Sequence, residues 1–127
     1  MPLVKISVPA HLSEAKTLAL SDAVHMALVA SCDVPLADRF QLITRYTGGA
    51  RHIDPAFPDR ARSADAAIVE IALRRGRTDD QKRALYRQTV DLAASAGWRA
   101  DDIMIALTEN TLIDWSFGGG IAQYAKG

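Results

Sequence analysis

This 127-residue sequence has only one cysteine, and it lacks long hydrophobic runs and an excess of charge of either sign. The single cysteine, Cys32, cannot form an internal disulfide, and its apolar surroundings favour a buried structural thiol. Fifteen Lys and Arg residues balance fifteen Asp and Glu residues, so no net field favours nucleic acid or an anionic membrane surface. We therefore expect no nucleic-acid or membrane partner and a reducing, cytoplasmic setting.

Signals for export, membrane insertion and metal binding are also lacking. The amino terminus has no charged region followed by an apolar run, and no later stretch approaches the roughly 20 residues of a membrane span. His11, His25 and His52 show no spacing typical of a metal site, and we assign them no chemistry. The glycine run at 118–120 lacks the lysine and helix of a phosphate-binding loop, so we expect no nucleotide site.

The first half of the chain has the periodicity of a strand, a helix and a second strand. Within residues 3–8, every second residue is apolar (Val4, Ile6 and Val8), whereas the residues between them are of mixed polarity, which predicts a strand. Ser13 can cap a helix that ends near Cys32. Four of its apolar residues recur at helical spacing: Leu20, Val24, Ala27 and Leu28. Residues 40–46, which follow Pro35, are predicted as the second strand.

The second half repeats this pattern after an aperiodic segment, residues 48–63, that we interpret as a loop with one short turn. Residues 67–73 and 103–107 are predicted as strands, and Thr78 begins a capping box for the helix between them. That helix is predicted to stop at Gly97. Its inward residues are predicted to be Leu85, Leu92, Ala93 and Ala96.

The two halves predict an α+β fold with an internal repeat. Thr78 follows Ser13 by 65 positions, and Asp101 follows Asp38 by 63. Two right-handed β-α-β units, at about residues 2–47 and 66–108, would share one four-stranded sheet with both helices on one face. We expect residues 1–127 to form a single domain with a tail at 109–127. The other sheet face needs cover, and self-association is the simplest cover.

The Met1-Pro2 start offers a possible catalytic group. A small second residue permits removal of the initiator methionine, which would make the secondary amine of Pro2 the chain terminus. The reference pKa of an α-amino group is about 8, so its surroundings decide whether such an amine acts as a base or as an acid. Proline after methionine is common in unrelated proteins, so Pro2 needs support from other residues.

That support comes from two segments, VPLADRFQ at residues 34–41 and DWSFGGGIAQY at residues 114–124. Together with Pro2, the strand after it and the repeat, they resemble the malonate semialdehyde decarboxylase family of the tautomerase superfamily. The resemblance runs from Pro2 to Tyr124, and the Trp-Ser-Phe-Gly segment is its most specific element. It implies a tautomerase-like fold, a homotrimer and no metal or organic cofactor.

The resemblance also implies roles for individual residues. Pro2 matches the catalytic amino-terminal proline, Asp38 the carboxylate that activates water, and Arg77 the arginine before the second helix. A second arginine lies just upstream in the family, and either Arg74 or Arg75 aligns with it, as a substrate ligand or a further catalytic residue. The positions that form an apolar wall around the substrate are Trp115, Phe117 and Tyr124.

Each of these residues also has a plainer interpretation. Asp38 could cap a turn or pair with Arg39. The arginines at 74–77 could form a solvated basic loop, although such a cluster can also bind a carboxylate bidentately. Trp115 and Phe117 could be ordinary core or interface residues.

The implied reaction is decarboxylation of a short 3-oxo acid, such as malonate semialdehyde, to acetaldehyde and carbon dioxide. Arginines would hold the carboxylate, Pro2 would hydrogen-bond to or covalently capture the aldehyde carbonyl, and Asp38 would activate water. Two alternatives stay open: a keto–enol tautomerase or hydratase of unsaturated 2-oxo acids, and a non-catalytic binding protein with the same pocket.

Overall fold

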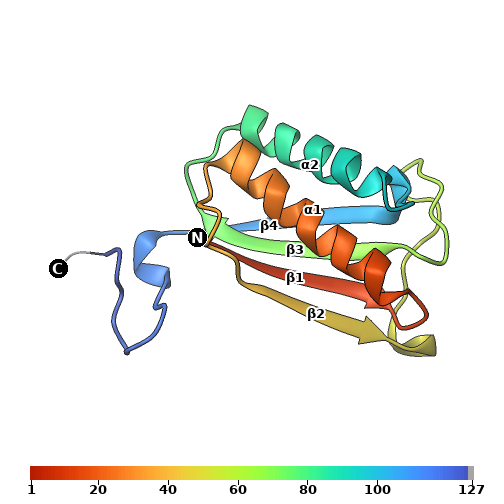
Figure 1. The fold of residues 1–127 in the computed structure, drawn as a ribbon, viewed down its shortest axis with the longest axis horizontal. Helices are drawn as coiled ribbons and strands as arrows, with labels where there is room; N and C mark the ends of the chain where they lie inside the picture. The colour runs from red at the N-terminus through yellow and green to blue at the C-terminus, as the bar shows by residue number, and fades with distance from the viewer. Residues whose placement is uncertain (126–127) are drawn as a thin grey trace.

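The computed structural model describes residues 1–125, and it shows a four-stranded sheet with two helices on one face (Figure 1). The strands are β1 (Pro2–Pro9), β2 (Gln41–Tyr46), β3 (Ala67–Arg74) and β4 (Ile103–Asn110), and the helices are α1 (Glu14–Cys32) and α2 (Asp79–Ala94). Short 3-10 helices span Gly48–Ala50, Ala100–Asp102 and Leu112–Asp114. The predicted α+β class, with two β-α-β units sharing one sheet, is confirmed. The last two residues of the predicted tail lie outside the described residues.

The strand order β2-β1-β3-β4 joins the two units through the middle of the sheet. β1 is parallel to β2 and β3 is parallel to β4, whereas the central pair β1–β3 is antiparallel, with Pro2 opposite Leu73. The amino end of β1 therefore lies beside the carboxyl end of β3. The chain also leaves β4 at this end, next to the amino terminus (Figure 1).

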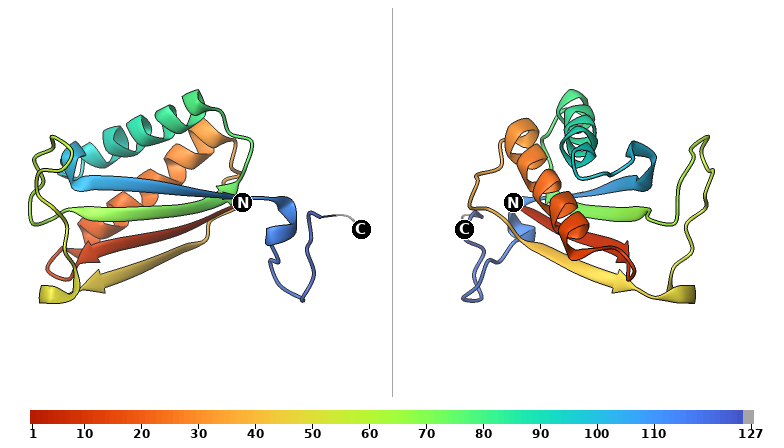
Figure 2. Two further views of the ribbon diagram at one scale, coloured as in Figure 1. Left: turned by 180° about the vertical axis from the view of Figure 1, so that it is seen from behind. Right: turned by 45° about the vertical axis from the view of Figure 1, so that its right-hand side comes forward.

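The core lies between the sheet and the two helices. Val4, Ile6 and Val8 of β1 are buried, as their alternation predicts. The four apolar residues of α1 that recur at helical spacing are buried as well. Figure 2 shows the opposite sheet face, which neither helix covers. No helix among residues 1–125 has the length and apolar character to cross a membrane.

Two positions of the second helix differ from the prediction. Leu92 is 48% exposed, because the inward face of α2 is made by Leu85, Thr89 and Ala93, four residues apart, and Leu92 lies off that stripe. Ala96 is exposed because α2 ends at Ala94, two residues earlier.

The predicted helix caps are confirmed. The Ser13 side chain accepts a hydrogen bond from the backbone N–H of Lys16, and Thr78 forms a reciprocal capping box with Gln81. α1 ends at Cys32, which is buried, and Asp33 follows it in the left-handed conformation with φ 56°. The starts of both helices and the end of α1 are thus fixed by local sequence.

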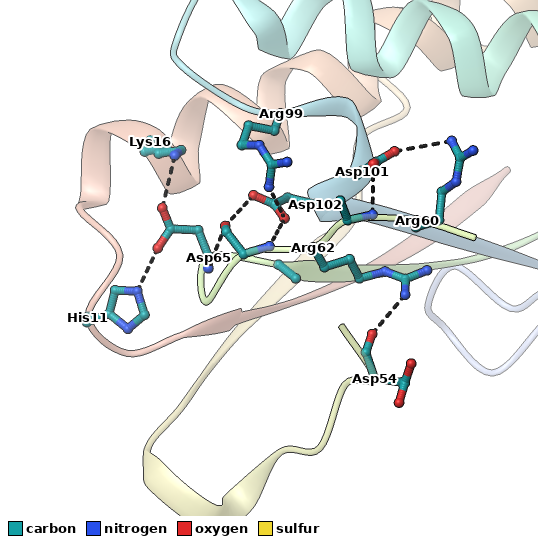
Figure 3. A network of polar contacts seen from close by, with 12 residues as sticks. His11, Lys16, Asp54, Arg60, Arg62, Asp65, Arg99, Asp101 and Asp102 are labelled. Carbon is teal, nitrogen blue, oxygen red and sulfur yellow. Dashed lines mark hydrogen bonds and ion pairs between the residues drawn. The ribbon is translucent and has the colours of Figure 1, made fainter. Parts of the chain in front are cut away.

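Carboxylates hold the long loop at residues 51–66 against the chain that enters β4 (Figure 3). The Asp102 side chain is buried and accepts hydrogen bonds from the backbone N–H and the hydroxyl of Ser63, at 2.7 and 2.6 Å. Asp101 accepts from the Ala61 N–H at 3.0 Å and pairs with Arg60 at 3.2 Å. The Ala61 N–H is the main reason that the pKa of Asp101 lies below its ordinary value.

We predict that Asp101→Asn reduces the loss of stability in acid. A carboxyl whose pKa is lower in the folded chain stabilises it above the unfolded pKa, near 3.9, and that stabilisation disappears as the pH falls through the folded value. The wild-type free energy of unfolding should therefore fall more between pH 6 and pH 2.5 than that of the variant, in urea titrations followed by circular dichroism. Asp91→Asn, on the exposed face of α2, is the control; equal acid losses in all three proteins would contradict the prediction.

Candidate active site

Four segments bring chemically active residues to one end of the sheet. Pro2 begins β1, Asp38 precedes β2, the arginines at 74–77 end or follow β3, and the aromatic tail follows β4. The antiparallel pairing of β1 with β3 and the two parallel outer pairs place these four points together. The residues implied by the resemblance therefore share one neighbourhood.

Asp38 contacts the amino terminus of the chain. The Met1 amine donates to Asp38 Oδ2 at 2.5 Å, and the Asp38 side chain is 18% exposed. Its other oxygen, Oδ1, is buried and has no hydrogen-bond partner among residues 1–125. The plainer interpretation that Asp38 pairs with Arg39 is wrong, because Arg39 Nη2 donates to Asp22 Oδ1 at 2.6 Å instead. The carboxylate is thus directed at the start of β1, where Pro2 is buried.

The Arg77 guanidinium donates three hydrogen bonds to backbone carbonyls, and two of its N–H groups have no partner among residues 1–125. Its Nε and Nη2 donate to the carbonyl of Cys32 at 3.2 and 3.0 Å, and its Nη1 donates to the carbonyl of Arg74 at 3.1 Å. A guanidinium has five N–H bonds, of which these contacts use three. One N–H on each terminal nitrogen is left, and these can donate to an anionic ligand.

Arg74 and Arg75 are both exposed, and they differ in their position relative to β4. Arg74 is the last residue of β3 and lies in register with Asn110, whereas the backbone N–H of Arg75 donates to the Asn110 carbonyl at 2.7 Å. No carboxylate of residues 1–125 forms an ion pair with Arg74, Arg75 or Arg77. These three positive charges are therefore not neutralised within the described part of the chain.

The aromatic residues of the tail form one cluster. Trp115 and Phe117 stack with ring centroids 5.7 Å apart, and Tyr124 meets Phe117 edge to face at 5.8 Å. The indole N–H of Trp115 donates to Asn110 Oδ1 at 2.6 Å, which fixes the cluster to the end of β4. Of the three residues predicted to form an apolar wall, Trp115 and Tyr124 thus both contact Phe117.

Phe40 joins this cluster, and the sequence interpretation missed it. Its ring lies 5.7 Å from that of Phe117, and its carbonyl accepts from the N–H of Val4 at 2.9 Å. Phe40 follows Asp38 by two residues within the segment quoted for the resemblance, which was the available signal. The aromatic cluster therefore bridges the segment before β2 and the tail after β4.

The tail turns back on itself through its glycines. Gly118, Gly119 and Gly120 have φ values of 130°, 75° and 74°, which residues with side chains rarely adopt. The Gln123 side chain closes the turn, accepting from the Phe117 N–H at 2.8 Å and donating to the Gly118 carbonyl at 2.6 Å. This turn brings Tyr124 against Phe117.

A hollow of about 510 Å³ lies at the opposite end of the sheet, beside His11, Tyr46 and Arg51. It contains none of the residues that the resemblance singles out. The candidate site instead surrounds the start of β1 and is open to solvent, because Phe40 and Tyr124 are both exposed in the single chain. No group of three or more His, Cys, Asp or Glu side chains within residues 1–125 is arranged to hold a metal ion.

Comparison with known proteins identifies the relatives of this chain. A family model described as a tautomerase enzyme matches residues 38–118. Probable tautomerase YusQ of Bacillus subtilis (strain 168) is 34% identical over 97% of this chain and 98% of its own length.

Two solved structures of malonate semialdehyde decarboxylases are similar to the whole chain. FG41 malonate semialdehyde decarboxylase, inhibited by 3-bromopropiolate, has a TM-score of 0.90 and 34% identity, with 96% of this chain and 93% of that chain covered. A second malonate semialdehyde decarboxylase has a TM-score of 0.89 and 29% identity, covering 96% of this chain and 95% of that chain. Its structures are described as a basis for decarboxylase and hydratase activities.

We predict that Arg77→Gln destabilises the fold while Arg75→Gln does not. The change at Arg77 removes a charged donor from the Cys32 carbonyl, at the negative end of α1, and should lower the free energy of unfolding by about 1–3 kcal/mol. The exposed Arg75 side chain should change it by less than about 0.5 kcal/mol. Urea unfolding of both variants checks this, and equal stabilities would show that the Cys32 contact contributes nothing.

Proposed function

The chain belongs to the tautomerase superfamily of enzymes, and from this membership we propose that it decarboxylates a short 3-oxo acid, converting malonate semialdehyde to acetaldehyde and carbon dioxide without a cofactor. One observation carries the proposal. A carboxylate directed at the start of β1, arginines that pair with no carboxylate of residues 1–125, and an aromatic cluster meet at one end of the sheet. The similarity to two malonate semialdehyde decarboxylases supports this choice of substrate.

The arginines would bind the carboxylate of the substrate. Arg77 has one N–H left on each terminal nitrogen, and its three contacts with backbone carbonyls orient the guanidinium before substrate arrives. For the second arginine the geometry favours Arg74, because the β3–β4 register puts it opposite Asn110, the residue that anchors Trp115. Arg75 stays the alternative.

Pro2 would act on the aldehyde carbonyl once Met1 is removed. In the structure the terminal amine contacts Asp38 Oδ2, and removal of Met1 would transfer the amine to Pro2, one residue further along. As an ammonium, Pro2 would donate a hydrogen bond to the carbonyl oxygen. As a neutral amine it would attack the carbonyl carbon, water would leave, and an iminium ion would form.

Either route gives the breaking bond an electron sink. The bond between the carboxyl carbon and the methylene carbon breaks, carbon dioxide leaves, and the electron pair moves toward the polarised carbonyl or the iminium nitrogen. A proton then adds to the methylene carbon. In the iminium route, addition of water finally releases acetaldehyde and restores the amine, and no external oxidant or reductant is needed.

Asp38 would activate water in this scheme. Its Oδ1 is buried without a hydrogen-bond partner among residues 1–125, so it can accept a hydrogen bond from a water molecule while Oδ2 holds the amine. Trp115, Phe117 and Tyr124 would form the wall on the apolar side, and Phe40 extends it. Exclusion of water there would strengthen the charge interactions that favour decarboxylation.

We predict that the processed enzyme releases acetaldehyde from malonate semialdehyde and that three variants lose this activity. Pro2→Ala, Asp38→Asn and Arg77→Ala should each lower kcat/KM by about a hundredfold or more, because each removes a group that contacts the reacting atoms or the carboxylate. Acetaldehyde is followed by coupled reduction, at a temperature at which each variant has a native circular dichroism spectrum.

Arg83→Gln is the matched control, since Arg83 is an exposed arginine on α2 that pairs with Asp80. A comparison of Arg74→Gln with Arg75→Gln assigns the second arginine, and we expect the larger loss at Arg74. Absence of turnover by processed wild-type protein would reject this substrate.

A keto–enol tautomerase or a hydratase of unsaturated 2-oxo acids is the second candidate. The family model and the Bacillus subtilis relative are both named for tautomerase activity, which favours it. The same Pro2 and arginines would serve, because one fold supports several related proton transfers. Phenylenolpyruvate tautomerisation and 2-oxo-acid hydration are the assays that separate it from the decarboxylase. A non-catalytic binding protein follows if native protein retains Met1, which intact mass measures, because the nitrogen of Pro2 is then an amide.

We also propose that the enzyme is a homotrimer in a reducing, cytoplasmic setting. Leu42 of β2 and Met104 of β4 are 58% and 45% exposed. Both lie on the face of the sheet that neither helix covers. Ile113 and Ile121 are exposed on the tail that projects from the domain (Figure 1). The single buried Cys32 suits a reducing compartment.

Sedimentation equilibrium is expected to give a mass three times that of the chain. Leu42→Glu should shift it toward the monomer, because the charge would be buried in the proposed contact. Leu18→Glu, at an exposed leucine on α1, is the control. A monomeric wild-type protein would contradict the proposal.

A further inference from the structure

Polar contacts join α1 to the segment that carries Asp38. We call them the α1 clasp, formed by Ser21, Asp22 and His25 of α1 with Leu36, Arg39 and Gln41 of the segment. The contacts lie on both sides of Asp38 in the sequence. They therefore restrain the turn from which its carboxylate projects.

His25 contacts the part of the segment that precedes Asp38. The ring is 3% exposed, and its Nε2 lies 2.7 Å from the carbonyl oxygen of Leu36. A carbonyl only accepts, so Nε2 carries the hydrogen in this bond. Leu36 lies within the turn closed by the hydrogen bond from the Asp38 N–H to the Pro35 carbonyl at 3.0 Å. The imidazole thus contacts the turn two residues before the carboxylate.

Arg39 and Gln41 bind the part of the segment that follows Asp38 to α1. Arg39 Nη2 donates to Ser21 Oγ at 3.0 Å and to Asp22 Oδ1 at 2.6 Å, and its Nε donates to Gln41 Oε1 at 3.0 Å. The Gln41 amide donates to the Ser21 carbonyl at 2.9 Å. Because the Arg39 guanidinium is engaged in this way, it does not pair with the neighbouring Asp38.

The second half of the repeat has no such clasp. At the 65-residue offset of the helix caps, Ser21, Asp22 and His25 correspond to Tyr86, Arg87 and Val90 of α2. Val90 occupies the position that corresponds to His25, so α2 has an apolar side chain where α1 has a buried imidazole. The same β-α-β packing is thus achieved without this histidine, so the fold does not require its hydrogen bond. The two halves also differ in the partner of the equivalent carboxylate, since Asp38 meets the chain terminus whereas Asp101 meets Arg60 and the Ala61 N–H.

We infer that His25 is a positioning residue, which orients Asp38 toward the terminal amine through the Leu36 carbonyl. The inference rests on the proposed function, in which Asp38 activates water. His25 itself does not touch the substrate. A displacement of about 1 Å in a reacting group can cost about a hundredfold in rate, so one hydrogen bond to this turn can matter.

Two variants separate the hydrogen bond from the volume of the ring. His25→Leu fills the space without a donor, and His25→Gln offers an amide N–H at a similar reach. We expect His25→Leu to lower kcat for malonate semialdehyde about ten- to a hundredfold with KM changed less than about twofold, because arginines and not Asp38 hold the carboxylate. His25→Gln should recover most of kcat, and His52→Leu, at an exposed histidine, should equal wild type.

A double variant tests whether His25 acts through Asp38. If it does, His25→Leu combined with Asp38→Asn has the same kcat as Asp38→Asn alone, because the second change removes nothing further. Losses that multiply would overturn the inference, and so would an unchanged kcat in His25→Leu.

Hydrogen exchange of the Asp38 backbone amide tests the inference without an activity assay. His25→Leu should exchange this amide faster than wild type, His25→Gln should not, and the amide of Leu28 within α1 should stay protected in both. Equal exchange at Asp38 in all proteins overturns the inference. If wild-type protein lacks decarboxylase activity but the exchange pattern appears, the proposed function fails while the restraint of Asp38 by His25 stands.

Discussion

The antiparallel pairing of β1 with β3 is the constraint on which the rest of this molecule depends. Within each β-α-β unit the strands are parallel, so the first unit places its candidates at the starts of β1 and β2, and the second places its candidates at the ends of β3 and β4. The pairing sets Pro2 against Leu73, and this brings the start of β1 beside the arginines that follow β3. β2 and β4 then add Asp38 and Trp115 at the same end, since each runs parallel to its central neighbour. The proposed catalytic centre is thus assembled from four distant parts of the chain.

The carboxyl-terminal half of α1 connects the two sides of that centre. Its last carbonyl, at Cys32, carries part of the negative end of the helix dipole, and it accepts two hydrogen bonds from Arg77 of the second unit. Its buried His25 holds the turn of Asp38 in the first unit. One rigid helix therefore sets both the cation and the carboxylate, and the distance between them is maintained by the packing that buries Leu20, Val24 and Leu28. Stability and site geometry are consequently linked at Arg77, where one guanidinium serves both.

Local patterns were sufficient to predict the fold, and non-local contacts were not predictable from them. Alternation located β1, and Ser13 and Thr78 marked the helix starts, because such signals act over a few neighbouring residues. Leu92 was placed inward because helical spacing does not say which of two adjacent stripes meets the sheet. The resemblance brought Asp38, Arg77 and the aromatic tail together as candidates. Neither periodicity nor resemblance revealed that Arg39 turns to Asp22, that Phe40 joins Phe117, or that His25 has a partner, because these contacts depend on how separate elements pack.

The charge of the chain has to be judged by its distribution. Fifteen basic and fifteen acidic residues cancel in the sum, so the net charge by itself indicates no preference for an anionic ligand. At the far end of the sheet the cancellation is also local, because Asp101 and Asp102 meet Arg60 and Arg99 within one network (Figure 3). At the end that holds Pro2, Asp38 is engaged by the terminal amine, and Arg74, Arg75 and Arg77 meet no carboxylate among residues 1–125. A neutral chain thereby presents a positive end, and close to aromatic surfaces such a field attracts a small carboxylate more strongly than the net charge suggests.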